Sequence, residues 1–328
     1  MLRSMTFGAA TFGAALLAGL TAFVTPSAAQ TYPSRAVKII VPFGPGGPAD
    51  VYARLVGQRL QEVFHQPFVI ENKPGAGSVI GTAEAAKAPA DGYTLLMMSN
   101  TQTANESLVK RRPYELMRDF TGVSPINYSD LVIVVNPSVP AKTLAEFIAL
   151  AKAKPGEIDY ASSGQGTPYH MATELFRAMS GTDMAHIAHR NSGDARNNVV
   201  GGHVKMMMDA VTTMAPMVQA GKVVALATTG PARSTVLPNV PTAEEAGLPG
   251  YQASIWLGIM APAGTPKEIV DKLNAEIVKY LSQPALKEDW AKTGAIPMIM
   301  TPSEFDAFLK ADVEKWRGVV TKFNITAD

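Results

Sequence analysis

The sequence predicts an α/β protein of two lobes, each a mostly parallel sheet flanked by helices. Short apolar runs, typical of buried strands, alternate along the chain with segments of helical periodicity. A unit of strand, glycine-bearing loop and helix occurs once in each half of the chain. Strands that alternate with helices form parallel sheets whose strand ends meet at one edge. We therefore expect the two glycine-bearing loops to face each other across a cleft.

The first unit consists of a strand predicted over 37–41, a loop at 43–50 and a helix predicted over 51–64. The loop reads Phe-Gly-Pro-Gly-Gly-Pro-Ala-Asp. It lies between the carboxyl end of a strand and the amino end of a helix, which is where open α/β sheets bind ligands. A structural turn without a ligand is the alternative, in which Asp50 only orients the loop amides.

The same loop also matches part of a dinucleotide-binding fingerprint. Gly44, Gly46 and Ala49 have the required spacing, and Glu71 follows about twenty residues later. The loop prolines lack the backbone donors that a pyrophosphate would use. Because the amino terminus also predicts export, we disfavour this interpretation and expect no cofactor.

Three further strands complete the first half of the chain. Strands are predicted over 67–71, 94–98 and 131–135, and the second of them runs into a polar tip that starts at Ser99. A small-residue helix is expected to begin near Ser78, whose hydroxyl would cap it. Each strand tip is therefore polar or rich in glycine.

The second glycine-bearing unit lies at 158–180. A short strand precedes the loop Ser162-Ser163-Gly164-Gln165-Gly166-Thr167-Pro168. Thr167 and Pro168 are the residues preferred at the N-cap and first position of a helix. Hydroxyls, glycines and a helix start together suit an anion. The alternative is a helix cap with a tight turn and no ligand.

The other predicted elements continue the alternation. A capping box at 143–146 starts a helix over 144–153, and a helical tail follows a last strong strand over 255–260. Strands are also expected over 184–188, 204–208 and 223–228, and helices over 195–200, 266–281, 284–292 and 302–320.

The amino-terminal 29 residues read as a signal peptide. Arg3 is the single charged residue, a small and apolar run follows it, and Ala29 ends a typical cleavage site. An uncleaved membrane anchor is the alternative, although glycines and threonines dilute the run. We expect a periplasmic protein, cleaved near Ala29.

Charge and cysteine content restrict the function. The chain has 29 basic and 28 acidic side chains, so removal of Arg3 with the signal leaves no formal net charge. A neutral exported chain without a basic stripe is a poor candidate for binding nucleic acid. The absence of cysteine excludes disulfides, thiol catalysis and cysteine-ligated zinc.

Five short segments, in this order along the chain, carry a family resemblance. They are FGPGGPAD at 43–50, ENKPGAG at 71–77, DGYTLL at 91–96, YASSGQG at 160–166 and LPNVPT at 237–242. Together they resemble the Bug family, the TctC-like extracytoplasmic solute receptors of tripartite tricarboxylate transporters. The similarity runs from about residue 32 to the last helix.

The resemblance implies a type 2 periplasmic binding protein whose lobes close on a small carboxylate. Lobe 1 would comprise 30–128 and 252–328, lobe 2 would comprise 129–251, and the predicted signal peptide would be 1–29. The loop of the first lobe would meet the ligand through backbone and water, and the serine-glycine loop of the second would hold a carboxylate. The candidate ligand-binding residues are Phe43, Gly44, Gly46, Gly47, Asp50, Ser99, Ser162, Ser163, Gly164, Gly166, Thr167, His189, Arg190 and Asp209.

The segment Ala188-His189-Arg190-Asn191 departs from the family, which usually has proline, tyrosine, lysine and glycine there. Arg190 could pair with a carboxylate through two hydrogen bonds or be a solvated surface residue. Asp209, at a strand tip, could bind a ligand group or brace the loops of lobe 2. Four histidines of the second half suggest a metal, but His186 and His189 would point to opposite faces of a strand, so no metal is expected.

We therefore expect a receptor, not an enzyme, that captures a small organic carboxylate for a membrane transporter. It should be a monomer that closes by bending near Leu131 and Ile255. Two alternatives remain open. One is a sensory module that passes the signal to a sensor kinase. The other is an exported α/β hydrolase, although the chain lacks a Gly-x-Ser-x-Gly motif.

Overall fold

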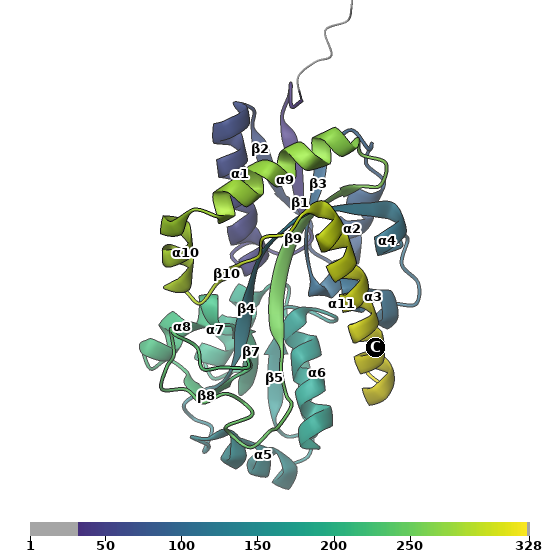
Figure 1. The fold of residues 1–328 in the computed structure, drawn as a ribbon. Coiled ribbons are helices and arrows are strands. Elements are labelled where there is room, and N and C mark those ends of the chain that lie inside the picture. Colours follow the sequence, from purple (N-terminus) through teal and green to yellow (C-terminus); the bar gives the residue numbers. More distant parts are fainter. Residues whose placement is uncertain (1–31, 327–328) are drawn as a thin grey trace, which may run out of the picture.

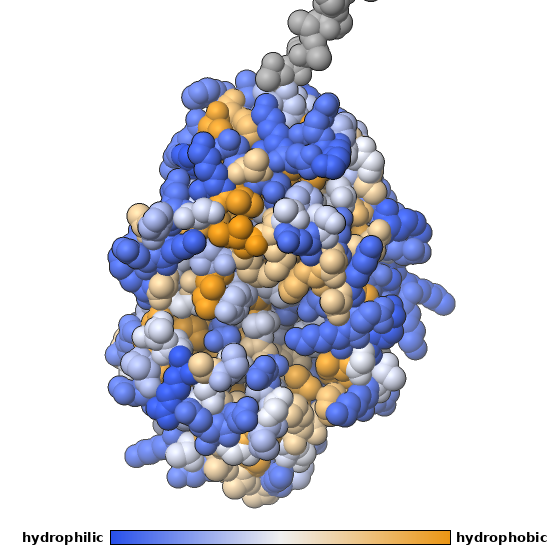
Figure 2. Space-filling model, viewed as in Figure 1, coloured by the Kyte–Doolittle hydropathy of each residue, from blue (hydrophilic) through white to orange (hydrophobic). Residues whose placement is uncertain are grey.

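The computed structural model describes residues 32–326, and the predicted signal peptide lies outside them. The described chain forms two α/β lobes, one above the other in Figure 1. The α/β prediction is thus confirmed. On the same face, Figure 2 shows hydrophobic residues interspersed among hydrophilic ones over both lobes. None of the described helices is both long and apolar enough to cross a membrane.

Lobe 1 is built on three parallel strands. Strand β1 (Val37–Val41) lies between β2 (Phe68–Asn72) and β3 (Thr94–Ser99). Helix α1 (Pro48–Phe64) packs against them through Ala53, Val56 and Leu60, whose helical spacing places them on one buried face. The other helices of this lobe are α2 (Val79–Ala86), α3 (Asn100–Leu108), α4 (Leu116–Asp119), α9 (Lys267–Leu281), α10 (Pro284–Ala291) and α11 (Pro302–Phe323).

Lobe 2 repeats the arrangement with its own parallel strands. Strand β5 (Asp159–Ser162) lies between β6 (Ala185–Ala188) and β7 (Met206–Ala210). Its helices are α5 (Leu144–Ala153), α6 (Pro168–Ser180), α7 (Ser192–Val200) and α8 (Val211–Gln219). Helix α5 has the predicted bounds, and its capping box between Thr143 and Glu146 is present.

Two long strands join the lobes. Strand β4 (Phe120–Val135) pairs antiparallel with β9 (Ser254–Pro262) up to Asp130, and from Leu131 onward it pairs with β7 and with β8 (Val224–Thr228). The described strands therefore follow the order β2-β1-β3-β9-β4-β7-β5-β6, with β8 and the short β10 (Ile296–Pro297) paired to β4. The predicted strand at 131–135 is only the lobe 2 end of a much longer one. The lobe boundaries at 128/129 and 251/252 remain predictions.

Several predicted bounds were wrong for local reasons. Helix α1 begins at Pro48 rather than residue 51, because proline suits the first helical turn. The polar tip after β3 is the capping box of helix α3. Helices α3, α4 and α8 were not predicted. Ser78 precedes α2, but its side chain does not cap the helix, because the residue adopts a left-handed conformation with φ of 75°.

The carboxyl-terminal segment returns to lobe 1 and completes its core. Phe305 of α11 is fully buried, and its ring centroid lies 6.1 Å from that of Trp256 on β9. Asp306 accepts a 2.8 Å hydrogen bond from the Gly122 amide. Helix α11 then runs along α3 to the level at which the lobes meet (Figure 1).

Replacing Phe305 by alanine should lower the free energy of unfolding by about 3–5 kcal/mol, because it leaves a cavity between α11 and β9. Urea denaturation measures this loss. Phe308→Ala on the same helix is the matched control, since Phe308 is half-buried and should cost less than half as much. Equal losses would contradict the packing described here.

Candidate functional site

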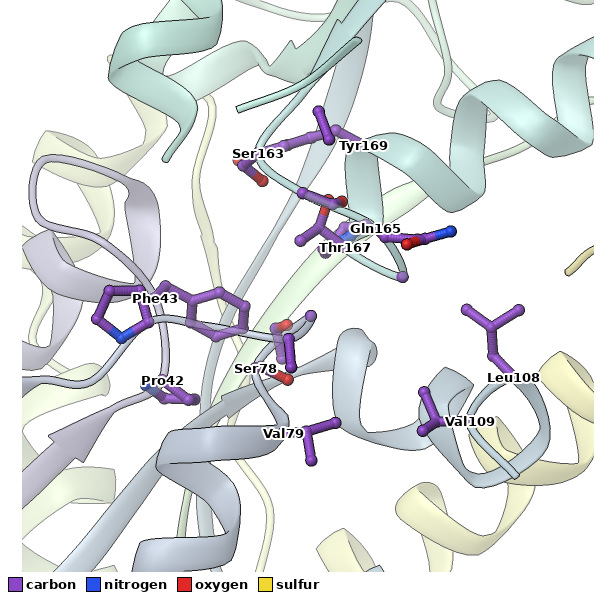
Figure 3. A pocket seen from close by; sticks show the side chains of 18 of the residues that line it. Pro42, Phe43, Ser78, Val79, Leu108, Val109, Ser163, Gln165, Thr167 and Tyr169 are labelled. Carbon is purple, nitrogen blue, oxygen red and sulfur yellow. The ribbon is translucent and has the colours of Figure 1, made fainter. Parts of the chain in front are cut away.

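A cavity of about 1190 Å³ lies between the lobes. Lobe 1 contributes the β1–α1 loop, the turn before α2 and the end of α3. Lobe 2 contributes the β5–α6 loop and the segment that follows β6. Figure 3 shows Phe43 and Ser78 of lobe 1 on the opposite side from Ser163, Thr167 and Tyr169 of lobe 2. The two glycine-bearing loops thus face one crevice, as the sequence predicted.

Three helices begin at the wall of this cavity without a side-chain cap. Helix α1 follows Gly47, α2 follows Ser78 and α6 follows Thr167, and all three of these residues line the cavity. The first N–H groups of a helix lack partners inside the helix and carry partial positive charge. Uncapped starts also occur at α4, α8, α9 and α10, outside the cavity, so the convergence of three is the informative feature.

The loop of lobe 2 is held by its own hydrogen bonds. The Thr167 hydroxyl donates to the Gly164 carbonyl at 2.6 Å instead of capping α6. The Gly166 amide donates to Nδ1 of His170 at 3.2 Å. Gly164 and Gly166 have φ of 117° and 72°, where other residues are strained. The loop is therefore rigid while its hydroxyl-bearing residues Ser163 and Thr167 line the cavity.

The lobes touch each other through glycines. A Cβ added to Gly44 would lie 2.6 Å from Cβ of Asn191, and one added to Gly47 would lie 2.8 Å from Oγ of Ser192. On the other side, a Cβ on Gly77 would overlap the carbonyl oxygen of Gln165. The structure is thus a closed form in which bare backbone lets the lobes approach.

The structure brings most of the predicted site residues to this cavity. Those that line it are Phe43, Gly44, Gly47, Ser99, Ser163, Gly164, Gly166, Thr167, His189 and Arg190. Gly46, Asp50, Ser162 and Asp209 do not line it and have partners within their own lobes. They support the walls rather than form them.

The two predicted aspartates brace the loops. Asp50 accepts hydrogen bonds from Arg54 (2.8 Å), the Gly46 amide (3.0 Å) and Asn72 (3.0 Å). Burial alone would raise the pKa of the Asp50 carboxyl, but these hydrogen bonds lower it. Asp209 is fully buried and pairs with Arg196 at 2.9 Å. Burial raises the pKa of Asp209, and Arg196 opposes that rise.

Two neutral histidines support the lobe 2 loop from behind. Oγ of Ser162 lies 2.6 Å from Nε2 of His186, and the His186 and His170 ring centroids are 4.3 Å apart. Burial lowers the pKa of His170 to about 4, with Glu174 opposing the shift and Arg177 adding to it. Burial and the neighbouring His170 lower the pKa of His186 to about 4 as well. Within residues 32–326, no three histidine, aspartate or glutamate residues group as a metal site.

Several lining residues were missed. Ser78 and Tyr169 belong to helix starts, and their position next to the glycine loops could have identified them. Lys110 and Arg111 follow α3, an unpredicted helix, and Ile325 follows α11. Nothing in the local sequence marks the ends of α3 and α11 as neighbours of the cleft, because only the tertiary fold brings them there.

Two α/β lobes, two crossing strands and a cleft between helix starts define a two-lobed solute-binding protein. The chain belongs to the family of tripartite tricarboxylate transporter receptors, TctC, whose profile matches residues 52–325. The predicted Bug resemblance is therefore confirmed. The members of this family are solute-binding receptors. The prediction of a receptor rather than an enzyme is therefore confirmed as well.

Similar proteins support this assignment. BugT of Bordetella pertussis is 39% identical over 297 residues, which cover 90% of this chain and 91% of BugT. A protein of R. palustris solved with adipate is 32% identical, with a TM-score of 0.87 over 90% of this chain and 99% of that one. MatC from Rhodopseudomonas palustris, solved with bound malate, is 31% identical, with a TM-score of 0.84 over 88% of this chain and all of MatC.

The buried histidines should make stability depend on pH. The folded pKa of His170, about 4, is below its ordinary value of 6.5, so the unfolded chain binds the proton first as pH falls. Stability should be full above pH 6.5 and decline toward pH 4, by up to about 1.4 kcal/mol per pH unit for each such group.

His170→Asn keeps an acceptor for the Gly166 amide but cannot titrate. Urea unfolding between pH 7.5 and 4.5 should give a shallower decline for this variant than for the wild type. His203→Asn is the control, because His203 is exposed and its loss should leave the decline unchanged. Parallel declines in all three proteins would rule out this role for His170.

Proposed function

We propose that this protein captures a small organic carboxylate in the cleft between its lobes, in the periplasm, and delivers it to a transporter of the tripartite tricarboxylate type. The observation that carries the proposal is the convergence of three uncapped helix starts, from both lobes, on one cavity. An acid group between them would accept hydrogen bonds from main-chain N–H groups of α1 and α6. Helix α2 would contribute through its dipole, because its Val79 and Ile80 amides already donate to the Ala76 and Gly75 carbonyls.

The free energies of a charge at these helix starts favour an anion as the ligand. A negative charge at one helix start gains about 0.3–1 kcal/mol when exposed, and up to about 2 kcal/mol when partly buried. Three such starts in a cleft that excludes water can therefore supply several kcal/mol before any side chain contributes. A cation would lose the same energy, and a neutral sugar would gain little of it.

The relatives support the ligand class and the partner. One is solved with adipate and another with malate, both carboxylic acids. The family takes its name from tripartite transporters, which makes a transporter the proposed partner. We propose that the lobes close by bending where β4 and β9 pass between them. Thr229 connects the two strands there, because its hydroxyl accepts from the Leu131 amide at 2.8 Å and donates to the Ala253 carbonyl at 2.5 Å.

A thermal-shift screen of organic acids tests the proposal. An acid present at one hundred times its dissociation constant should stabilise the fold by about 2.7 kcal/mol. Mass spectrometry should then recover that acid unchanged. Failure of every mono-, di- and tricarboxylate to shift the melting temperature would overturn the proposal.

Gly44→Ala should weaken ligand binding at least about tenfold, or about 1.4 kcal/mol, because its Cβ would meet Asn191 only when the lobes close. Gly44 has no positive φ, so alanine adds no backbone strain. Isothermal titration calorimetry with an acid from the screen measures the loss.

Two controls separate closure from other effects. Gly318→Ala on α11 has open space around it and should bind like the wild type. Adding Asn191→Gly to Gly44→Ala removes the obstructing Cβ and should recover most of the affinity, since glycine costs little at an N-cap. If the double variant binds as weakly as Gly44→Ala, steric obstruction of closure is not the cause.

A further inference from the structure

We propose that uncompensated positive charge on both walls of the cleft holds the empty receptor open, and that the negative charge of the ligand allows the lobes to close. This inference rests on the proposed function, because it takes the ligand to be an anion. It concerns the receptor without ligand and makes closure depend on charge as well as on shape.

Both lobes contribute positive charge to the cavity. Lobe 1 contributes Lys110 and Arg111, which follow α3, and lobe 2 contributes Arg190, which follows β6; all three side chains are exposed. The partial positive charges of the helix starts add to them, at α1 and α2 on lobe 1 and at α6 on lobe 2. Figure 3 shows Val109, which precedes the lobe 1 cations, across the cavity from Thr167. Closure therefore brings charges of the same sign toward each other.

No acidic side chain compensates this charge. Within residues 32–326, no aspartate or glutamate lines the cavity, and none of its three cations forms an ion pair. Glu106, the nearest acid in sequence to the lobe 1 cations, is engaged by Arg112 at 2.8 and 2.7 Å. Asp194, the nearest acid in sequence to Arg190, does not line the cavity and accepts a 3.0 Å hydrogen bond from Asn191.

The carbonyl ends of two helices reduce the charge only in part. The ends of α3 and α11 reach the same cavity, and the end of a helix carries partial negative charge. Arg112 offsets this at α3, because it donates to the carbonyls of Asn105, Glu106 and Val109. The two full positive charges that follow α3 exceed the remaining partial charge of α11.

The closed lobes are not held together by opposite charges. Within the described part of the chain, every ion pair lies inside one lobe and none crosses the cleft. The contacts at Gly44, Gly47 and Gly77 are close packing, whose attraction is lost over about 1 Å of separation. The empty closed form therefore combines short-range packing with longer-range repulsion.

An anion reverses this balance. A ligand shifts an equilibrium between two forms only by the difference in its interactions with them, and an anion in the cleft is attracted by both walls at once only in the closed form. A neutral molecule of the same shape would leave the repulsion in place. A partner that recognises the closed form would thus meet few empty receptors.

A disulfide between the lobes can report on closure. The chain has no cysteine, so two introduced cysteines can pair only with each other. A Cβ on Gly47 would lie 2.8 Å from Oγ of Ser192, close to the roughly 3 Å between a Cβ and the far sulfur of a disulfide. The reporter protein, Gly47→Cys/Ser192→Cys, is equilibrated with reduced and oxidised dithiothreitol, an uncharged redox pair. Mass spectrometry then gives the effective concentration of the two thiols, which rises with the closed fraction.

The reporter protein is compared with two double variants made in the same background, without any carboxylate. The cavity variant is Lys110→Ala/Arg111→Ala. The control, Lys152→Ala/Lys154→Ala, removes two exposed lysines from the region of α5, outside the cavity. The ionic strength is about 20 mM, at which exposed charges interact over roughly 20 Å.

We expect the cavity variant to show at least about a threefold higher effective concentration than the reporter protein, and the control to match the reporter protein. In about 0.5 M sodium chloride the difference should disappear, because screening then acts within roughly 4 Å. Arg190→Ala should act in the same direction as the cavity variant. In its background the gain from Lys110→Ala/Arg111→Ala should be smaller, because part of the opposing charge is already gone.

Three results would overturn the inference. The first is an equal effective concentration in the cavity variant and the reporter protein, and the second is an equal rise in the control. The third is a difference that persists in high salt. Since no acid is present, none of these results bears on the proposed function, which the thermal-shift screen tests separately.

Small-angle X-ray scattering repeats the comparison without the introduced cysteines. Without ligand and at low salt, Lys110→Ala/Arg111→Ala should be more compact than the wild type, and Lys152→Ala/Lys154→Ala should not. Equal radii of gyration in all three proteins would also overturn the inference.

Discussion

The antiparallel pairing of β4 with β9 is the constraint on which the rest of the molecule depends. The two strands form the connection between the sheets, and β4 exchanges β9 for β7 between Asp130 and Leu131. Because this connection fixes which strand ends face each other, the loops after β1 and β5 open onto one cavity. Thr229 adds a hydrogen-bonded link at the same level, so bending there would move whole lobes rather than single loops.

The cavity joins two different ways of attracting an anion. Near the glycine loops, positive potential comes from main-chain N–H groups of helix starts, which have a fixed position and do not titrate. Near the end of α3 it comes from the exposed side chains of Lys110 and Arg111, which line the same cavity. The first arrangement recognises the negatively charged acid group, which every carboxylate has. The second, together with His189 and Arg190, is where one receptor can differ from another.

The local sequence pattern was enough to predict the alternation of strands and helices, the glycine loops and the bounds of α5. Each of these depends on residues that are close together in the sequence. The length of β4 was not predictable in this way, since Gly122 and Pro125 interrupt its apolar pattern and only pairing with β9 holds them in a strand. For Asp50 and Asp209 the sequence left two roles open, contact with a ligand or bracing of the loops. The choice depends on the pairing with Arg54 and Arg196, which local sequence does not reveal.

The glycine contacts between the lobes have a consequence for how such a receptor can diversify. At Gly44, Gly47 and Gly77, backbone of one lobe rests against the other, so even a methyl group would act as a wedge. Variation in ligand preference must then accumulate elsewhere, at positions that border the crevice without joining its two halves. To engineer a biosensor for a new acid, one would keep Gly44, Gly47 and Gly77 and randomise residues that line the cavity without touching the opposite lobe.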